Sequence, residues 1–175
     1  MKRVLFISIF AALSIICSAQ EAYKLSSVIQ AEGKSSEQIY SAVKSWSLKA
    51  LRSVKDAQQM DDPEAKILSY RISADYSYGS FSMIAYDGWY SYQLTVQCRD
   101  GRFKAEITNV IHENKPGNAK NCSLGLILSD SNAYKSHNKK VVEDIQNKLS
   151  TSFDNLCKEI ENIVNSAGQS AEDDW

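Results

Sequence analysis

The stretch from Ser91 to Ile111 holds two runs of alternating apolar and polar residues that meet at Asp100-Gly101. An Asp-Gly pair between two such runs is a strong signal for a hairpin with a two-residue turn, because both central positions need positive φ. The turn also fixes the register, so that residues whose numbers add to 201, as those of Asp100 and Gly101 do, face each other. A slip of one residue would move every side chain to the wrong face, so this hairpin strongly constrains the fold.

The two faces of the hairpin differ in polarity. On one face nearly every pair is apolar: Cys98 with Phe103, Val96 with Ala105, Leu94 with Ile107, Tyr92 with Asn109, and Tyr90 with Ile111. On the other face the pairs are polar: Gln97 with Lys104, Thr95 with Glu106, and Gln93 with Thr108. Turn chemistry and side-chain period therefore agree on one register, and they predict an antiparallel sheet with one buried and one solvated face.

Three further strands are predicted around the hairpin. Residues 68–76 alternate between apolar and polar side chains, which is typical of a half-buried strand. Residues 54–60 form a poorly apolar run that favours an edge strand, and the acidic run with a proline at 61–64 predicts a turn between the two. An initial strand is expected over residues 23–30.

Two helices are predicted before and after the other strands. Ser35 and Gln38 are spaced as a capping box at the start of the first helix. Its buried face is expected to hold Ile39, Val43, Trp46 and Ala50. After a long connection at 112–138, the second helix carries one apolar stripe: Val142, Ile145, Leu149, Phe153, Leu156, Ile160 and Val164. The order strand, helix, four strands, helix predicts an α+β fold in which two helices cover one face of an antiparallel sheet.

The N-terminus has the features of a secretory signal peptide. Lys2 and Arg3 precede an apolar run at 4–16, and Ser18 and Ala19 supply the small residues of a cleavage site. A membrane-spanning helix would need about 20 apolar residues, so this run is too short to be one. The pattern therefore predicts export to the periplasm or cell envelope, or secretion, and a mature chain without a transmembrane helix.

This interpretation divides the chain into three parts. We expect a signal peptide at 1–19, a single α+β domain at 20–165, and a disordered acidic tail at 166–175. A lipoprotein modified at Cys17 is the alternative, but such signals have a small residue directly before the cysteine, and this chain has Ile16 there.

The charge balance argues against a nucleic-acid partner. The chain has 20 basic and 21 acidic residues, and removal of Lys2 and Arg3 leaves 18 basic ones. No basic excess remains to neutralise a phosphate backbone, so we expect no nucleic-acid binding.

Three cysteines follow the predicted signal peptide, so at most one disulfide can form within the mature chain. Cys98 falls on the apolar face of a strand and Cys157 lies beside the stripe of a helix, which favours two small buried hydrophobic side chains. Cys122 falls in a predicted loop and is the thiol expected to react.

Few residues stand in catalytic or metal-binding patterns. His112 and Glu113 could serve as the base and orienting acid of a hydrolase, but the more common interpretation is that the loop histidines are solvated. The spacing of His112, Cys122 and His137 matches no zinc pattern, and the acidic run at 61–64 lacks the Asp-x-Asp-x-Asp-Gly rhythm of a calcium hand. We therefore expect no metal, no cofactor and no catalytic residue, with a hydrolase as the alternative.

An aromatic-rich segment lies at 76–92. Three of its aromatic residues already belong to the buried face: Tyr76, Tyr90 and Tyr92. The other four fall in a connection longer than a hairpin requires and are candidate ligand-binding residues: Tyr78, Phe81, Tyr86 and Trp89. Aromatic side chains displayed on a loop are typical of protein or glycan recognition. The alternative is that the strands continue past the sheet and the rings pack over the end of the core.

Four short motifs occur in order along the chain: Ser36-Glu37-Gln38-Ile39-Tyr40 with Trp46, Asp61-Asp62-Pro63-Glu64-Ala65-Lys66-Ile67, Cys98-Arg99-Asp100-Gly101-Arg102-Phe103, and Glu106-Ile107-Thr108-Asn109. Together they resemble a family of secreted Bacteroidetes proteins described as a domain of unknown function with a TATA-binding-protein-like (TBP-like) fold. The resemblance covers residues 23–110. It implies a fold and a compartment, but no catalytic residue and, because function belongs to sites and not to folds, no DNA binding.

These observations favour an exported, non-catalytic binding or interaction module of the cell envelope. Its partner is expected to be an envelope protein, a glycan or a small apolar ligand, bound by the aromatic connection or by the open face of the sheet. The sequence leaves the choice among these partners open.

Overall fold

The structure is a computed structural model that describes residues 20–117 and 122–167. The predicted signal peptide at 1–19 lies outside the described residues, as does most of the predicted acidic tail, 168–175. Of that tail, Ser166 still belongs to the last helix, and the Ala167 N–H donates to the Ile163 carbonyl at 2.9 Å.

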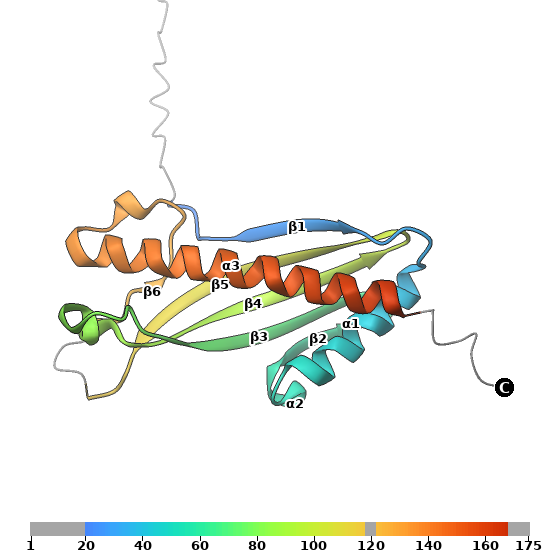
Figure 1. Cartoon of the computed structure of the whole chain (residues 1–175), viewed down its shortest axis with the longest axis horizontal. Coiled ribbons are helices and arrows are strands. Elements are labelled where there is room, and N and C mark those ends of the chain that lie inside the picture. The colour runs from blue at the N-terminus through green and yellow to red at the C-terminus, as the bar shows by residue number, and fades with distance from the viewer. Residues whose placement is uncertain (1–19, 118–121, 168–175) are drawn as a thin grey trace, which may run out of the picture.

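One antiparallel sheet forms the body of the described chain (Figure 1). Its strands lie in the order β1-β5-β4-β3-β2, and β6 pairs with the C-terminal half of β5. The strands are β1 (Leu25–Gln30), β2 (Gln58–Asp62), β3 (Ile67–Tyr76), β4 (Gly88–Arg99), β5 (Arg102–Asn114) and β6 (Gly125–Leu126). The antiparallel sheet predicted from the hairpin is confirmed.

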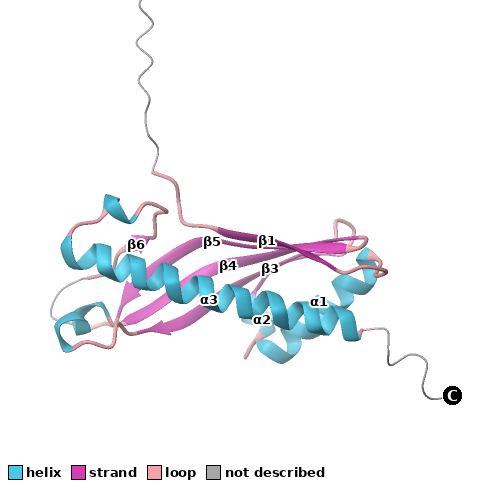
Figure 2. Cartoon of the chain, turned by 45° about the horizontal axis from the view of Figure 1, so that its top comes forward, coloured by secondary structure: helices cyan, strands magenta, loops and turns pink. Residues whose placement is uncertain are grey.

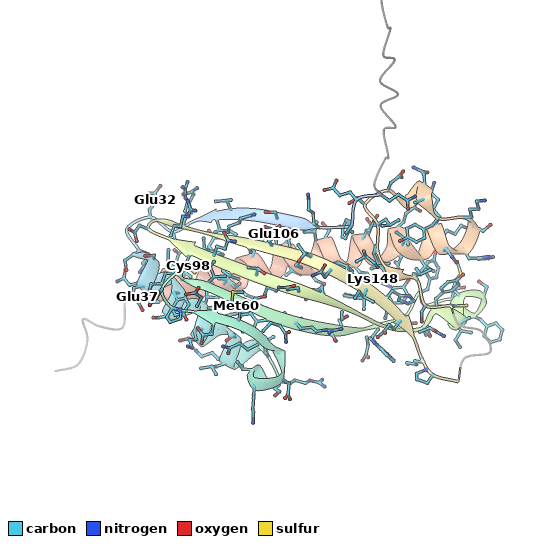
Figure 3. All side chains as sticks on the ribbon, turned by 180° about the vertical axis from the view of Figure 1, so that it is seen from behind. Glu32, Glu37, Met60, Cys98, Glu106 and Lys148 are labelled. Atoms are coloured by element: carbon cyan, nitrogen blue, oxygen red, sulfur yellow. The ribbon has the colours of Figure 1, made fainter. Side chains whose placement is uncertain are left out.

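Two long helices cover one face of this sheet (Figure 2), and the other face carries no described helix (Figure 3). The helical elements are α1 (Ser36–Ala50), α2 (Val54–Ala57), the 3-10 turn η1 (Phe81–Tyr86), the 3-10 turn η2 (Ser131–Ala133) and α3 (Ser136–Ser166). The predicted α+β architecture, with helices on one face of an antiparallel sheet, is confirmed.

Local sequence explains where α1 begins and how it meets the sheet. The Ser35 hydroxyl accepts from the Gln38 N–H at 3.2 Å, and the Gln38 side chain accepts from the Ser35 N–H at 2.9 Å, which is the predicted capping box. The Trp46 ring meets the Tyr70 ring of β3 edge-on, with 6.4 Å between centroids. Ile39, Val43 and Trp46 are buried as predicted, but Ala50 is exposed because it is the last residue of the helix.

The stripe of α3 is nearly the predicted one. Its buried residues are Val141, Val142, Ile145, Leu149, Phe153, Cys157, Ile160 and Val164. Leu156 is only half-buried, since Cys157 fits the same helical period and takes the core position. Although α3 is 31 residues long, neither it nor any other helix in the described chain is apolar enough over a sufficient length to cross a membrane.

The segment predicted as a strand at 54–60 begins with a helical turn. The Ala57 N–H donates to the Ser53 carbonyl at 3.1 Å, and the Ser53 hydroxyl donates to Asp56 Oδ2 at 2.7 Å. This local bonding outweighs a weak strand pattern. The strand starts only at Gln58, and from there it lies at the sheet edge as predicted.

The long connection predicted at 112–138 contains regular structure. β5 continues to Asn114, and both β6 and η2 fall within the predicted connection. A two-residue strand such as β6 has no side-chain period that a sequence could reveal.

Near its turn, the hairpin of β4 and β5 has the predicted register, from Cys98 opposite Phe103 to Gln93 opposite Thr108. The turn itself differs, because only Gly101 has positive φ, at 73°. Asp100 instead uses its carboxylate to accept from the Ser36 N–H at 2.7 Å, at the start of α1. The turn therefore also fixes the position of the first helix.

The register changes where a β-bulge interrupts β5. Asn109 and Val110 together lie opposite the single residue Tyr92. Asn109 has positive φ, at 53°, a conformation that Asn adopts more readily than most residues. The predicted pair of Tyr92 with Asn109 is therefore wrong.

Beyond the bulge, Ser91 pairs with Ile111 and Tyr90 with His112, so the predicted pair of Tyr90 with Ile111 is also wrong. Val110 and His112 are fully buried, whereas Ile111 is only half-buried. The extra residue thus exchanges the two faces over the last part of β5, and His112 enters the core where a solvated loop was expected.

An Asn109→Ala substitution should lower the free energy of unfolding by about 1–2 kcal/mol, because alanine in a left-handed conformation is sterically strained. Asn109→Gly should cost less, since glycine adopts positive φ freely, although both variants lose the 3.1 Å hydrogen bond from Asn109 to Gln93. Urea denaturation of both proteins checks the difference. Equal stability of the two variants would contradict a conformational role for residue 109.

Candidate functional site

The aromatic-rich segment joins β3 to β4 at one end of the sheet, where η1 projects (green, at the left end of Figure 1). Tyr78 and Tyr86 are half-buried and lie against the core, and the Tyr86 hydroxyl donates to Asn138 Oδ1 at 2.5 Å. Phe81, by contrast, is 90% exposed. Trp89 lies beyond the turn on β4. The four candidate residues are therefore divided between core contacts and surface positions.

Phe81 has a second apolar side chain beside it on η1. Side chains three residues apart lie on the same side of a 3-10 turn, which places Ile84 next to Phe81. Ile84 is 54% exposed, and residues 76–86 contain no charged side chain. We call Phe81 and Ile84 the apolar tip. Ile84 is not among the predicted site residues because it is not aromatic, although its spacing of three residues from Phe81 would have indicated it.

Several backbone bonds hold the apolar tip in place. Met83, on the opposite side of η1, is only 3% exposed, and its N–H donates to the Ser80 carbonyl at 2.9 Å. The Asp87 N–H closes the turn onto the Ile84 carbonyl at 3.1 Å, and the Lys115 N–H donates to the Asp87 carbonyl at 2.8 Å. The tip is thus presented by a turn anchored in the core and bonded to the segment that follows β5.

Trp89 belongs to a different surface. It lies between Asp75 of β3 and Glu113 of β5, and its indole N–H donates to Glu113 Oε2 at 2.8 Å. It contributes to a groove of about 820 Å³ between the end of α1, α2 and β3. The groove is lined by residues 50–53, 56–57, 71–75 and 89. Neither residue of the apolar tip lines it, so the structure separates Phe81 from Trp89.

His112 and Glu113 do not form the pair that a hydrolase would need. They are successive residues of β5, so their side chains point to opposite faces, and His112 is fully buried while Glu113 is exposed. The Leu124 N–H donates to Nδ1 of His112 at 3.3 Å. Nε2 therefore carries the hydrogen and donates to the Tyr86 carbonyl at 2.9 Å. Both ring nitrogens are hydrogen-bonded to backbone groups, so neither is available to a substrate.

The described residues also offer little support for metal binding or thiol catalysis. Among the described residues, no three His, Cys, Asp or Glu side chains gather as a metal site would require. Cys98 and Cys157 are buried free thiols, as predicted, and burial raises the pKa of Cys98 to about 12 and that of Cys157 to about 11. Thiols with such pKa values are inert near neutral pH, because the thiolate is the reactive form. Cys122 is a free thiol of intermediate exposure.

The acidic run at 61–64 serves the fold. Asp61 accepts hydrogen bonds from Lys44 of α1, at 2.6 Å, and from Tyr40, and these bonds keep the pKa of its carboxyl group below the ordinary value. Asp62 accepts from the N–H groups of Glu64 and Ala65 at 3.0 and 2.9 Å. The structure therefore shows a turn bonded to α1.

The buried His112 should make the protein less stable in mild acid. Burial lowers the pKa of His112 in the folded state, while in the unfolded chain it stays near 6.5. Below that pH the unfolded chain binds a proton that the folded protein resists, so the free energy of unfolding falls by up to about 1.4 kcal/mol per pH unit. The effect fades above pH 6.5, as the unfolded chain also loses that proton.

His112→Gln, which cannot titrate, should therefore lose less stability between pH 7.5 and 5.5 than the unmodified protein. Urea denaturation at several pH values provides the measurement. His137→Gln is the matched control, since His137 is the other histidine of the chain and lies exposed on α3. If His112→Gln kept the full pH dependence, some other group would be responsible.

Comparison with known proteins gives two related crystal structures and one family. No curated protein matches the chain. A TBP-like protein from Parabacteroides distasonis ATCC 8503 superposes with a TM-score of 0.66 at 13% identity, over 82% of this chain and 93% of its own. A DUF4468 family protein from Bacteroides ovatus ATCC 8483 gives 0.53 at 14% identity, over 82% and 86%. At these identities the likeness shows the fold alone.

The family assignment comes from the sequence. Residues 25–113 match the family described as "Domain of unknown function (DUF4468) with TBP-like fold". This range includes β1 to β5 apart from the last residue of β5, and it agrees with the resemblance found at residues 23–110. The chain therefore belongs to the DUF4468 family, whose fold is TBP-like.

Proposed function

We propose that this protein is a non-catalytic binding module that docks a partner protein through the apolar tip. One observation carries the proposal: Phe81 is 90% exposed at the end of a turn whose other side is anchored in the core. Covering a large exposed apolar side chain with a partner removes it from water, which lowers the free energy of the complex. Aromatic residues that fill a pocket on a partner provide much of the energy of many interfaces.

The shape of the tip supports a protein partner over a small ligand. Small molecules bind in concave sites that surround most of their surface, whereas η1 projects from the end of the sheet (Figure 1). The absence of charge at 76–86 also matches the centre of protein interfaces, where charged residues are depleted. A receiving protein would supply the pocket.

The groove beside Trp89 would suit a glycan, which is one of the partners expected from the sequence. It is concave, and it combines an aromatic ring with charged groups at Arg52, Asp56, Arg71 and Asp75. A glycan could stack on the ring and form hydrogen bonds with those groups. Loss of ligand binding in Trp89→Ala, with Phe81→Ala unaffected, would favour this second function.

The site of action proposed here is the periplasm or the cell envelope. The signal-peptide features of residues 1–19 support it. A non-catalytic role is supported by the opposite orientations of His112 and Glu113 and by the low reactivity of the two buried thiols.

Phe81→Ala should leave the free energy of unfolding within about 0.5 kcal/mol of the original, because its side chain contributes little to the core. Met83→Ala, on the buried side of the same turn, should cost about 2–5 kcal/mol. Thermal or urea denaturation distinguishes these outcomes. A large loss of stability in Phe81→Ala would mean that Phe81 is a core residue and would contradict the proposal.

The partner itself can be sought by placing p-benzoylphenylalanine at position 81 and irradiating intact cells. A discrete adduct with one protein is expected, and it should disappear when the same probe is placed at position 48. Leu48 is the matched control because it is another exposed apolar residue, 67% exposed on α1. Identical adducts at both positions, or none at position 81, would contradict the proposal.

A further inference from the structure

The two edges of the sheet are protected to different degrees. At one edge, β2 is short, has an irregularity between Gln58 and Met60, and ends in Asp61 and Asp62. Bulges, short length and charge are devices that keep an edge from pairing with another chain. The other edge, β1, runs regularly from Leu25 to Gln30 without a proline, a glycine, a bulge or a charged residue.

The backbone of β1 offers hydrogen bonds to the outside. The Ala31 N–H donates to the Gly101 carbonyl at 2.8 Å, so the odd-numbered residues of this strand direct their backbone groups toward β5. The even-numbered residues Ser26, Val28 and Gln30 therefore direct theirs away from the sheet. No described strand pairs with β1 on that side (Figure 1).

The side chains of the same three residues are exposed. Val28, in the middle, is 55% exposed, and it has Ser26 and Gln30 on either side along the strand. An apolar, β-branched side chain at the centre of an uncharged edge favours strand pairing.

We propose that a second copy of this chain pairs with β1, antiparallel, with Val28 on the two-fold axis. In this register residues whose numbers add to 56 face each other, so Val28 meets Val28 and Ser26 meets Gln30 of the second copy. All of these residues direct their backbone groups outward, so each of the three pairs can exchange two hydrogen bonds. The interface is isologous, because the same strand serves both copies.

Charge complementarity selects this register. Lys24 precedes the strand and Glu32 follows it, and the same rule places Lys24 of one copy opposite Glu32 of the other at both ends of the interface. Glu32 is exposed, lies at the end of β1 (Figure 3), and has no ion pair within the described residues. Lys24 is exposed, and within the described residues its one ion pair is with Glu21, three residues away. A shift by two residues would place Lys24 opposite Gln30 or Lys34, and Glu32 opposite Ala22 or Ser26, so neither charge would face an opposite one.

Pairing along β1 would also join the two sheets into one. Residues that face each other across neighbouring strands lie on the same face of a sheet, so the helices of both copies would cover the same side. The β2 edges would lie at the two outer ends of the combined sheet, and the dimer would stop there because those edges are protected.

The mass of the purified protein should be measured by sedimentation equilibrium from 1 to 100 μM. A reversible dimer is expected, and Val28→Lys should weaken dimerisation at least tenfold, because it brings two like charges together on the axis. Leu48→Lys is the matched control, since it adds the same charge at an exposed apolar residue away from β1, and it should dimerise normally. Circular dichroism establishes that both variants are folded. A monomer across the whole range, or equal dimerisation of Val28→Lys and the original, would overturn the proposal.

The register is tested by exchanging the charges. Lys24→Glu alone, or Glu32→Lys alone, should weaken the dimer by about threefold or more, because each places like charges opposite each other. The double variant should recover most of the lost affinity. Because Lys24 also pairs with Glu21, Glu21→Gln is the control for loss of that contact, and it should leave dimerisation unchanged. Failure of the double variant to recover would overturn the register with Val28 on the axis.

Discussion

The hairpin of β4 and β5 is the constraint on which the rest of this structure depends. Its two strands are the longest in the sheet, every other strand pairs directly with one of them or with β3 beside them, and both long helices lie on its apolar face. Its turn also bonds to the start of α1 through Asp100. A sheet with one covered face requires strict alternation of side chains, so the hairpin determines which residues can enter the core.

The bulge at Asn109 changes that alternation once, and several local features follow from it. By turning Val110 and His112 inward, it lets His112 bond to the backbone of both η1 and the residue before β6. Gly88 lies close to this end of β5, where a β-carbon on it would overlap the Glu113 carbonyl. The bulge at Asn109 therefore determines which residues of β5 support the apolar tip from inside the core.

Much of the fold could be predicted from the sequence. The long helices and strands repeat their apolar pattern over many residues, and the Asp-Gly turn fixes how two of the strands pair. The bulge could not be predicted, because without it Tyr90 would face Ile111, and that apolar pair fits the pattern just as well. The helical turn at Val54–Ala57 depends on local hydrogen bonds of Ser53, which the alternation of apolar and polar residues does not reveal. For the candidate site, the sequence identified the segment but not which of its aromatic residues are exposed, because the exposure of Phe81 and the partial burial of Tyr86 depend on how η1 is oriented.

The position of β1 at the sheet edge has a consequence for the time course of folding. Leu25 pairs with Ile107, a partner 82 residues further along the chain, whereas β4 and β5 are joined by two residues. Local contacts form quickly, and closing a long loop costs entropy that must be repaid by contacts made afterwards. As the chain leaves the ribosome, β1 emerges before the other described strands yet must wait for β5, so its backbone groups remain in water until nearly the whole sheet has assembled. We therefore expect the first strand in the sequence to be among the last to gain protection from hydrogen exchange.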